Sequence, residues 1–198
     1  MGLREKKAQK VREAIYDAML TLAERDGYEA ATLEQVAERA EVAISTVYRY
    51  FANKDAILLD PFESSTRALV DAFRARPEDE DVTVSLGWTV HAALDIDPEQ
   101  LAQLRRLRAQ LDRAPGPRAR LWDVLQRQRV LLEEAIAERS GRDPLWNEAA
   151  AHLTIMIIGM AADHDRDSLD EITPNRYADQ IIAMLHGAGS PLPTRERR

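Results

Sequence analysis

Residues 32–55, TLEQVAERAEVAISTVYRYFANKD, contain two short helical patterns separated by a few residues. Thr32 and Gln35 have the spacing of a capping box, in which side chains and backbone exchange two hydrogen bonds where a helix begins. Apolar residues then recur at helical intervals, at Leu33, Val36, Ala37 and Ala40. We therefore expect a short helix that is buried along one side, with a turn at Val42, where the period is interrupted.

A second short helix is expected after this turn. Val47 and Phe51 are four residues apart and give it one buried edge. The polar residues around these anchors face the other way: Ser45, Thr46, Tyr48, Arg49 and Tyr50. Two short helices joined by a tight turn, the second with a polar outer face, form a helix-turn-helix, which places its second helix in the major groove of DNA. The alternative is an ordinary helical hairpin inside a core.

This segment resembles the DNA-binding domain of TetR-family transcriptional repressors, in which the pattern T-x-x-x-I-A-x-x-A-G-V-S-x-x-T-x-Y-x-x-F-x-x-K-[DE] is typical. The residues that occupy its positions here are Thr32, Val36, Ala37, Ala40, Val42, Thr46, Tyr48, Phe51, Lys54 and Asp55. The resemblance is specific over about residues 10 to 58. It implies a transcriptional regulator, most often a repressor, that binds a palindromic operator as a homodimer and is released by a small-molecule effector.

Two residues depart from the pattern. Glu41 stands where the turn usually carries glycine, so the turn either needs no left-handed residue or is built at some strain. Ala43 stands where a serine usually caps the second helix, and this loss costs ~1 kcal/mol unless Ser45 caps a shorter helix.

The resemblance and the position of the second helix predict a set of DNA contacts. Those implied at phosphate are Thr32, Tyr48, Tyr50 and Lys54. Ser45 and Thr46 lie at the end of the helix that meets base edges, and Arg49 is expected on phosphate or guanine. Ile44 cannot form hydrogen bonds, so it either packs on a thymine methyl group or covers the surface of the first helix.

Composition and charge favour a helical protein with a basic arm. The chain has 198 residues, no cysteine, and a net charge of -7. The expected arm carries Arg4, Lys6, Lys7, Lys10 and Arg12. Acidic residues gather elsewhere, as at 78–81. Charges more than about 8–10 Å apart are largely screened, so the arm can attract phosphate although the net charge of the chain is negative. The arm is otherwise simply a solvated helix face. A signal-peptide core and a membrane-length apolar run are not evident, so we expect a soluble, cytoplasmic protein.

Proline, glycine and capping residues divide the chain into a series of expected helices. No strand-like alternation of apolar and polar residues is evident, so we predict an all-α fold. We expect a three-helix DNA-binding domain over residues 1–53 and a larger helical domain over 54–198 for effector binding and dimerisation. Pro61 should kink the fourth helix or loosen its start. The expected helices beyond the two short ones are Arg4–Asp26, Ala56–Arg76, Val82–Leu94, Glu99–Arg113, Arg118–Arg139, Pro144–Asp163 and Asn175–His186.

The helix over residues 145–163 is apolar on nearly every side, which indicates burial on more than one side. One face can enter its own bundle while another meets a second subunit, and the resemblance also implies a dimer through the last two long helices. The residues predicted for the dimer interface are Trp146, Ala150, Leu153, Ile157, Ala161, Ile181, Ile182 and Leu185. The alternative is a helix central to a larger monomeric core.

A small-molecule site is expected among the middle helices, where Gln128 interrupts an apolar stripe and needs a polar partner. An apolar effector with one or two polar groups fits best. Its predicted contacts are Trp88, His91, Leu104, Leu107, Leu111, Trp122, Leu125, Gln128, His152, Met156 and Met160. Scattered histidines and the lack of cysteine predict no metal or cofactor, and catalytic motifs are lacking, so we expect no enzyme. The alternatives are a DNA-binding regulator without an effector, or a helical carrier or enzyme with a vestigial DNA-binding domain.

Overall fold

The computed structural model describes residues 2–167, 172–187 and 191. These residues form α-helices joined by turns and loops, without a strand in the described part of the chain, so the all-α prediction is confirmed. The chain divides into two compact units. Unit 1 comprises residues 1–65 and 97–125, and unit 2 comprises residues 66–96 and 126–198.

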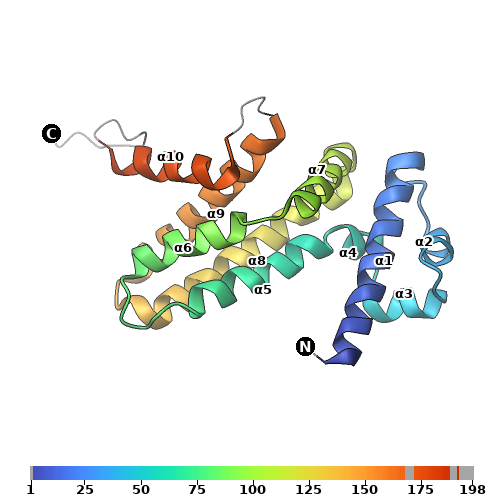
Figure 1. Ribbon diagram of the computed structural model, residues 1–198, viewed down its shortest axis with the longest axis horizontal. Helices are drawn as coiled ribbons and strands as arrows, with labels where there is room; N and C mark the ends of the chain where they lie inside the picture. The colour runs from blue at the N-terminus through green and yellow to red at the C-terminus, as the bar shows by residue number, and fades with distance from the viewer. Residues whose placement is uncertain (1, 168–171, 188–190, 192–198) are drawn as a thin grey trace. The chain divides into compact units, whose positions relative to one another are not determined.

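Unit 1 is built around α1 (Leu3–Asp26), with α2 (Leu33–Arg39) and α3 (Ile44–Tyr50) beside it (Figure 1). The unit also contains α4 (Lys54–Leu58) and α7 (Pro98–Arg113), both of which pack on α1. Apolar residues at helical spacing, Val11, Ile15, Ala18, Met19 and Leu22, predict one buried stripe on this helix; the last four are buried and Val11 is half-buried. Gly27 ends α1 with a φ of 88°, a left-handed conformation that costs glycine little.

The core of unit 1 joins residues that are distant in the sequence. Val36, Val47 and Phe51 from the two short helices are buried in the same cluster as α1. The cluster also contains side chains from a much later part of the sequence, namely Leu107, Leu111, Ala114 and Val124. The predicted domain boundary after residue 53 therefore does not coincide with the division of the structure.

The prediction of a single helix over Ala56–Arg76 is wrong. The chain forms α4 and then α5 (Asp60–Arg74), with Leu59 between them as the C-cap of α4. Pro61 explains the break, because proline has no backbone N–H for a helical hydrogen bond and its ring clashes with the carbonyl four residues earlier. A proline in the first turn of a new helix has neither problem.

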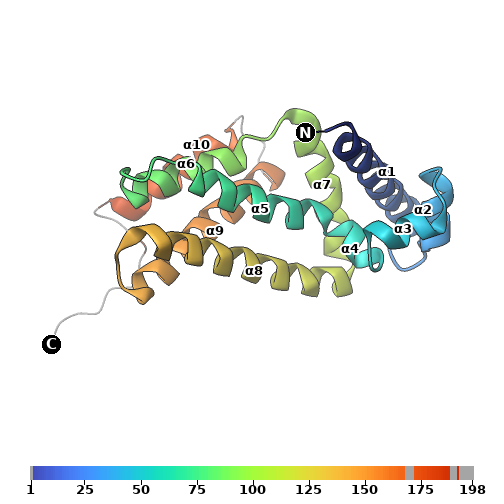
Figure 2. The same ribbon diagram turned by 90° about the horizontal axis from the view of Figure 1, so that it is seen from below.

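Unit 2 consists of α6 (Val82–Leu94), α9 (Pro144–Asp167) and α10 (Pro174–His186), with the later parts of α5 and of α8 (Pro115–Ser140). Figure 2 shows α6 and α10 side by side, and both pack on α9. One cluster joins Phe73, Leu132 and Ile136, and another joins Val90 and Ile157. Residues 114–117 were expected to separate two helices. Ala114 alone separates them, because Pro115 already begins α8 and the first helical turn tolerates proline.

Among the residues that the structure describes, one helix is long and apolar enough to cross a membrane, Pro144–His164, although no apolar run of that length was expected from the sequence. Length and composition are the only grounds, and the core helix of a soluble protein passes the same test. Ala151, Ile157 and Ala161 of this helix are buried in the fold. The run is therefore weak evidence for a membrane segment.

Candidate nucleic-acid interface

The start of α2 has the predicted capping box. The backbone N–H of Gln35 donates to Thr32 Oγ1 over 3.2 Å, and the N–H of Thr32 donates to Gln35 Oε1 over 2.9 Å. Both donors would otherwise lack partners at a helix start. Thr32 remains exposed, so its backbone and side chain lie at the surface where α2 begins.

The turn between α2 and α3 contains backbone strain, which was one of the two possibilities for Glu41. Glu41 adopts a φ of 54°, in the left-handed region that side chains with a Cβ atom disfavour. Ala43 is the N-cap of α3 and makes no capping hydrogen bond with its side chain. Ser45 lies within α3, so the alternative of a shorter helix capped by Ser45 is wrong.

The helix α3 has one buried edge and one polar face. Val47 is completely buried, whereas Ser45, Tyr48 and Arg49 are exposed. Thr46 and Tyr50 are half-buried, and the Arg49 guanidinium lies 5.2 Å from the centre of the Tyr50 ring. An exposed hydroxyl, phenol and guanidinium on one short helix can all donate hydrogen bonds to phosphates or base edges.

Ile44 is half-buried and packs against the core of unit 1. This position favours the second of the two roles predicted for it, which is to cover the surface of the first helix, because the cluster that it packs against contains the buried residues of α1. Ile44 is the first residue of α3, and the part of its side chain that the core does not cover is exposed at this end of the helix. A contact with a thymine methyl group therefore stays a prediction.

Lys54 was expected to contact a phosphate, and in this structure its side chain forms hydrogen bonds with backbone carbonyls of the protein. Its ammonium group is within 3.0 Å of the Tyr28 carbonyl and 3.1 Å of the Glu29 carbonyl. It also stands 4.5 Å from the centre of the Tyr28 ring. No local pattern indicates these partners, because they lie 26 and 25 residues away in a loop whose conformation depends on the fold.

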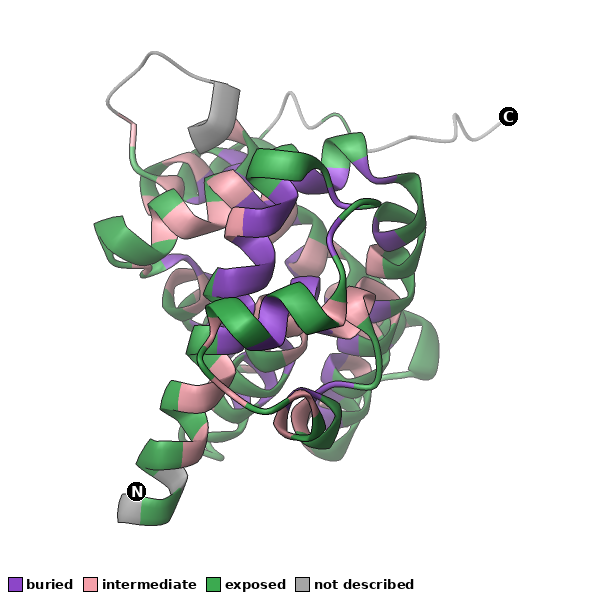
Figure 3. Ribbon diagram, turned by 90° about the vertical axis from the view of Figure 1, so that its right-hand side faces the viewer, coloured by how far each residue is buried: buried purple, intermediate pink, exposed green. Residues whose placement is uncertain are grey.

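The basic arm forms the first turns of α1 rather than an extended chain. Arg4, Lys6, Lys7 and Lys10 are exposed, and Figure 3 shows these turns coloured mainly as exposed ribbon. Arg12 differs, because it pairs with Asp60 and its guanidinium lies 4.8 Å from the centre of the Phe51 ring. The arm can therefore offer four of its five predicted cations to an anionic partner.

Two ion pairs of unit 1 join α7 to α1 and α8 to α4, and neither was predicted from the sequence. Arg106 donates to Glu24 over 2.7 Å and holds the pKa of that carboxyl below its usual range. Arg120 lies 2.5 Å from Asp55 in α4. The partners are 82 and 65 residues apart in the sequence, so no local pattern could have paired them.

The predicted dimer residues fall into two groups. Ile157, Ala161 and Ile181 are buried within the core of unit 2, so they offer no surface to a second subunit in this structure. The half-buried members are Trp146, Ala150, Leu153, Ile182 and Leu185. The outward face of α9 is instead the stripe with Leu145, Ala149, His152, Met156 and Met160, all of which are exposed.

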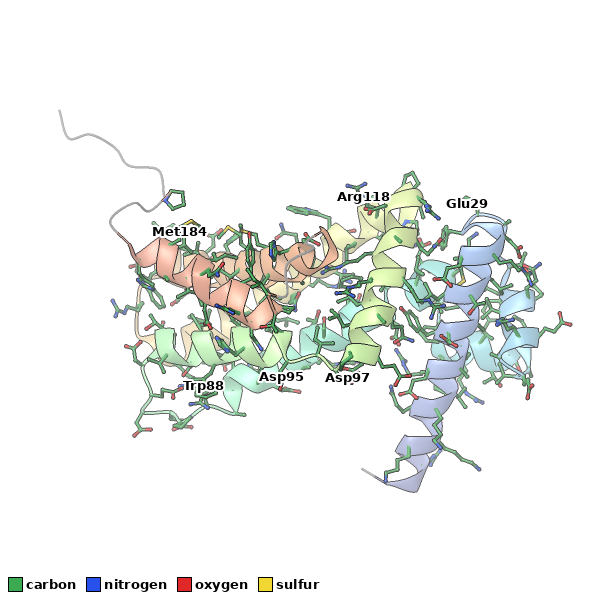
Figure 4. The ribbon with its side chains drawn as sticks, turned by 45° about the horizontal axis from the view of Figure 1, so that its top comes forward. Glu29, Trp88, Asp95, Asp97, Arg118 and Met184 are labelled. Atoms are coloured by element: carbon green, nitrogen blue, oxygen red, sulfur yellow. The ribbon has the colours of Figure 1, made fainter. Side chains whose placement is uncertain are left out.

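The predicted effector contacts are divided between the two units. In unit 1, Leu107 and Leu111 are buried, Leu104 and Leu125 are half-buried, and Trp122 is exposed. In unit 2, Gln128 is buried, His91 is half-buried and bonded to Asp179 over 2.8 Å, and Trp88 is 56% exposed (Figure 4). The remaining members, His152, Met156 and Met160, lie on the outward face of α9.

A pocket of about 180 Å³ in unit 2 shares no residue with this effector set. Its walls are mainly polar and charged: Glu80, Asp81, Val82, Thr83, Arg139, Ser140, Arg142 and Trp146. Arg139 closes one side by donating to the Phe73 and Pro77 carbonyls. These walls do not suit the apolar molecule that was predicted.

Comparison with known sequences places the N-terminal helices in a described family. The model for bacterial regulatory proteins of the tetR family matches residues 15–60. The transcriptional regulator TcmR of Streptomyces glaucescens is 29% identical over 151 residues, which cover 72% of this chain and 66% of TcmR. The transcriptional repressor KstR of Rhodococcus jostii is 53% identical over 48 residues, which cover 24% of this chain and 23% of KstR.

Solved structures share the fold. A TetR-family regulator from Syntrophomonas wolfei has a TM-score of 0.63 at 18% identity, with 94% of this chain and 98% of that chain covered. FadR from Bacillus subtilis in complex with stearoyl-CoA has a TM-score of 0.55 at 16% identity, with 89% and 98% covered. At such identities the likeness establishes the fold alone. The named relatives are transcriptional regulators, in agreement with the expectation that the chain is not an enzyme.

Proposed function

We propose that the chain, whose residues 15–60 match the model for bacterial regulatory proteins of the tetR family, is a cytoplasmic repressor that binds a two-fold symmetric operator as a homodimer. A small molecule that binds to its C-terminal helices would release it from the DNA. The observation that carries the proposal is the polar face of α3, where Ser45, Tyr48 and Arg49 are exposed while Val47 anchors the helix in the core.

Two neighbouring features support DNA as the partner of this face. Thr32 is exposed at the start of α2, and its hydroxyl, whose oxygen accepts the Gln35 N–H, can still donate its own hydrogen to a phosphate. The helical arm adds the cations of Arg4, Lys6, Lys7 and Lys10. Contacts of these kinds position a protein on the duplex, and the base edges are left to α3.

The homodimer would form through the outward stripe of α9. Met156 and Met160 are 40% and 42% exposed, and Leu145 is 74% exposed. Large apolar side chains gathered on one surface helix commonly mark a protein interface. On α10, Met184 is 44% exposed (Figure 4) and would extend the interface.

The effector would be an apolar molecule with a polar end. FadR from Bacillus subtilis has a similar fold and holds stearoyl-CoA, so long-chain acyl thioesters are the first compounds to test. A ligand can release the repressor only if it binds the free and DNA-bound states with different affinities, and this coupling is reciprocal. Operator DNA should therefore weaken effector binding by the same factor by which effector weakens DNA binding.

Selection of bound fragments from random duplex DNA tests the proposal without knowledge of the effector. The wild type should enrich one motif, and Arg49→Ala should lose most of that enrichment. Arg67→Ala is a matched control, since this exposed arginine belongs to unit 2, and it should enrich the same motif as the wild type. Failure of the wild type to enrich any sequence would contradict the proposal.

A further inference from the structure

The polar pocket of unit 2 lies where three helices begin or end. It is lined by the start of α6, the end of α8 and the first turn of α9, and Figure 1 shows these ends at the same end of unit 2. Its volume of about 180 Å³ gives room for several water molecules, and so for a small organic molecule rather than a drug-sized one. Because its walls share no residue with the predicted effector contacts, it is a separate site.

Arg139 brings a buried donor without a partner to this pocket. Its two terminal nitrogens donate to the Phe73 carbonyl over 3.1 Å and to the Pro77 carbonyl over 2.6 Å. Its Nε–H is buried and has no hydrogen-bond acceptor among the residues that the structure describes. A buried donor of this kind is costly, because it has given up water without gaining another partner. An acceptor inside the pocket would satisfy it.

Arg142 adds a guanidinium whose charge is available to a ligand. This exposed residue lies in the loop between α8 and α9, and its guanidinium stands 5.1 Å from the centre of the Trp146 ring. In the described part of the chain, no ion pair joins it to a carboxylate. A guanidinium that stacks on a ring keeps its N–H edge free, and this edge fits a carboxylate with two parallel hydrogen bonds.

The acidic walls limit the charge of the ligand. Glu80 is neutralised by its ion pair with Arg76, and Asp81 is the acidic wall that remains against Arg139 and Arg142. One positive charge is therefore left over, which a ligand with a single negative charge balances. A phosphate dianion would exceed this charge and would be repelled by Asp81.

We propose that this pocket binds a small monocarboxylate. The carboxylate would pair with Arg142 while one of its oxygens accepts the buried Nε–H of Arg139. A short apolar part would pack on Val82 and Trp146, the two apolar walls. The bound molecule would join the start of α6 to the corner between α8 and α9, and would stabilise unit 2 because it binds only the folded state.

NMR titration of the intact protein with butyrate tests the proposal. The chain has three tryptophans, and the indole N–H signal of Trp146 should shift to saturation, whereas that of Trp122 in unit 1 should stay in place. Butyramide, which has a similar shape without the charge, and inorganic phosphate at the same ionic strength should cause no saturable shift. A titration in which butyrate does not saturate, or in which either control is as effective, would overturn the proposal.

Arg142→Met removes the free guanidinium from the pocket. The dissociation constant of this variant for butyrate should rise at least about tenfold, because a charge-assisted pair of hydrogen bonds is lost. Arg67→Met changes an exposed arginine of α5 outside the pocket and should bind butyrate like the wild type. Equal affinities of Arg142→Met and the wild type would contradict the proposed site.

A measurement on the wild type tests the part of Arg139, whose replacement would also remove its hydrogen bonds to two backbone carbonyls. The Nε–H signal of Arg139 should move downfield as butyrate is added, since this donor gains an acceptor. An unchanged signal, together with a saturating shift at Trp146, would refute the assigned position of the carboxylate. These readouts need no DNA, so they test the pocket even if the protein enriches no operator.

Discussion

Glu41 holds the turn between α2 and α3 in a conformation that glycine adopts more easily. Its φ of 54° is left-handed, which costs a residue with a Cβ atom about 1–2 kcal/mol. Glycine avoids this strain but loses about 0.5–1 kcal/mol through the freedom of its unfolded chain. Glu41→Gly should therefore raise the free energy of unfolding by about 0.5–1 kcal/mol in urea titrations. Glu41→Ala keeps the strain and should bring no gain, and a less stable Glu41→Gly protein would contradict this account.

The pair of Arg76 and Glu80 makes the stability of unit 2 depend on pH. Hydrogen bonds from Arg76 and then from the Ser85 hydroxyl lower the pKa of Glu80 from 4.5 to about 2. The unfolded chain binds this proton more readily, so the contribution is complete above about pH 4.5 and is lost as the pH falls towards 2. The stability difference between wild type and Glu80→Gln should shrink from pH 6 to pH 3. A difference that stays constant over this range would refute the pairing.

At the scale of elements, α9 has one face in the core and one exposed face, which we propose meets the second subunit. Ile157 is 7% exposed and Met156 is 40% exposed, although they are adjacent. Met156→Arg should yield monomers in sedimentation velocity with little change in unfolding stability. Ile157→Arg buries an unpaired charge and should destabilise the fold by on the order of 3–5 kcal/mol. A Met156→Arg protein that remains a dimer would place the interface elsewhere.

The elements could be predicted from the sequence where their causes are local. The capping box of Thr32 and Gln35, the stripe of α1 and the missing cap at Ala43 all depend on neighbours within a few residues. The hydrogen bonds of Lys54 depend on carbonyls that only the folded loop brings together. The faces of α9 were also beyond prediction, because a helix that is apolar on every side does not indicate which side its own chain covers.

At the scale of the whole molecule, the core of unit 1 requires residues from two distant parts of the chain. Leu107 and Leu111 are buried in the cluster that also contains Val36 and Val47. A fragment of residues 1–65 should therefore lack a cooperative thermal transition by circular dichroism. Joining residues 97–125 to it through a flexible linker should restore the transition. An equally cooperative fragment without this addition would show that the extra helix is dispensable.

The central claim is that two copies of α3 read one symmetric operator. Hydroxyl-radical footprinting of the selected duplex tests this most directly, because it maps every protected position on both strands. Two equivalent protected patches should appear, related by two-fold symmetry and centred about 10–10.5 base pairs, or a multiple of this, apart. Met156→Arg, which is expected to be monomeric, should protect one patch at most. A single asymmetric footprint from the wild type would contradict the account.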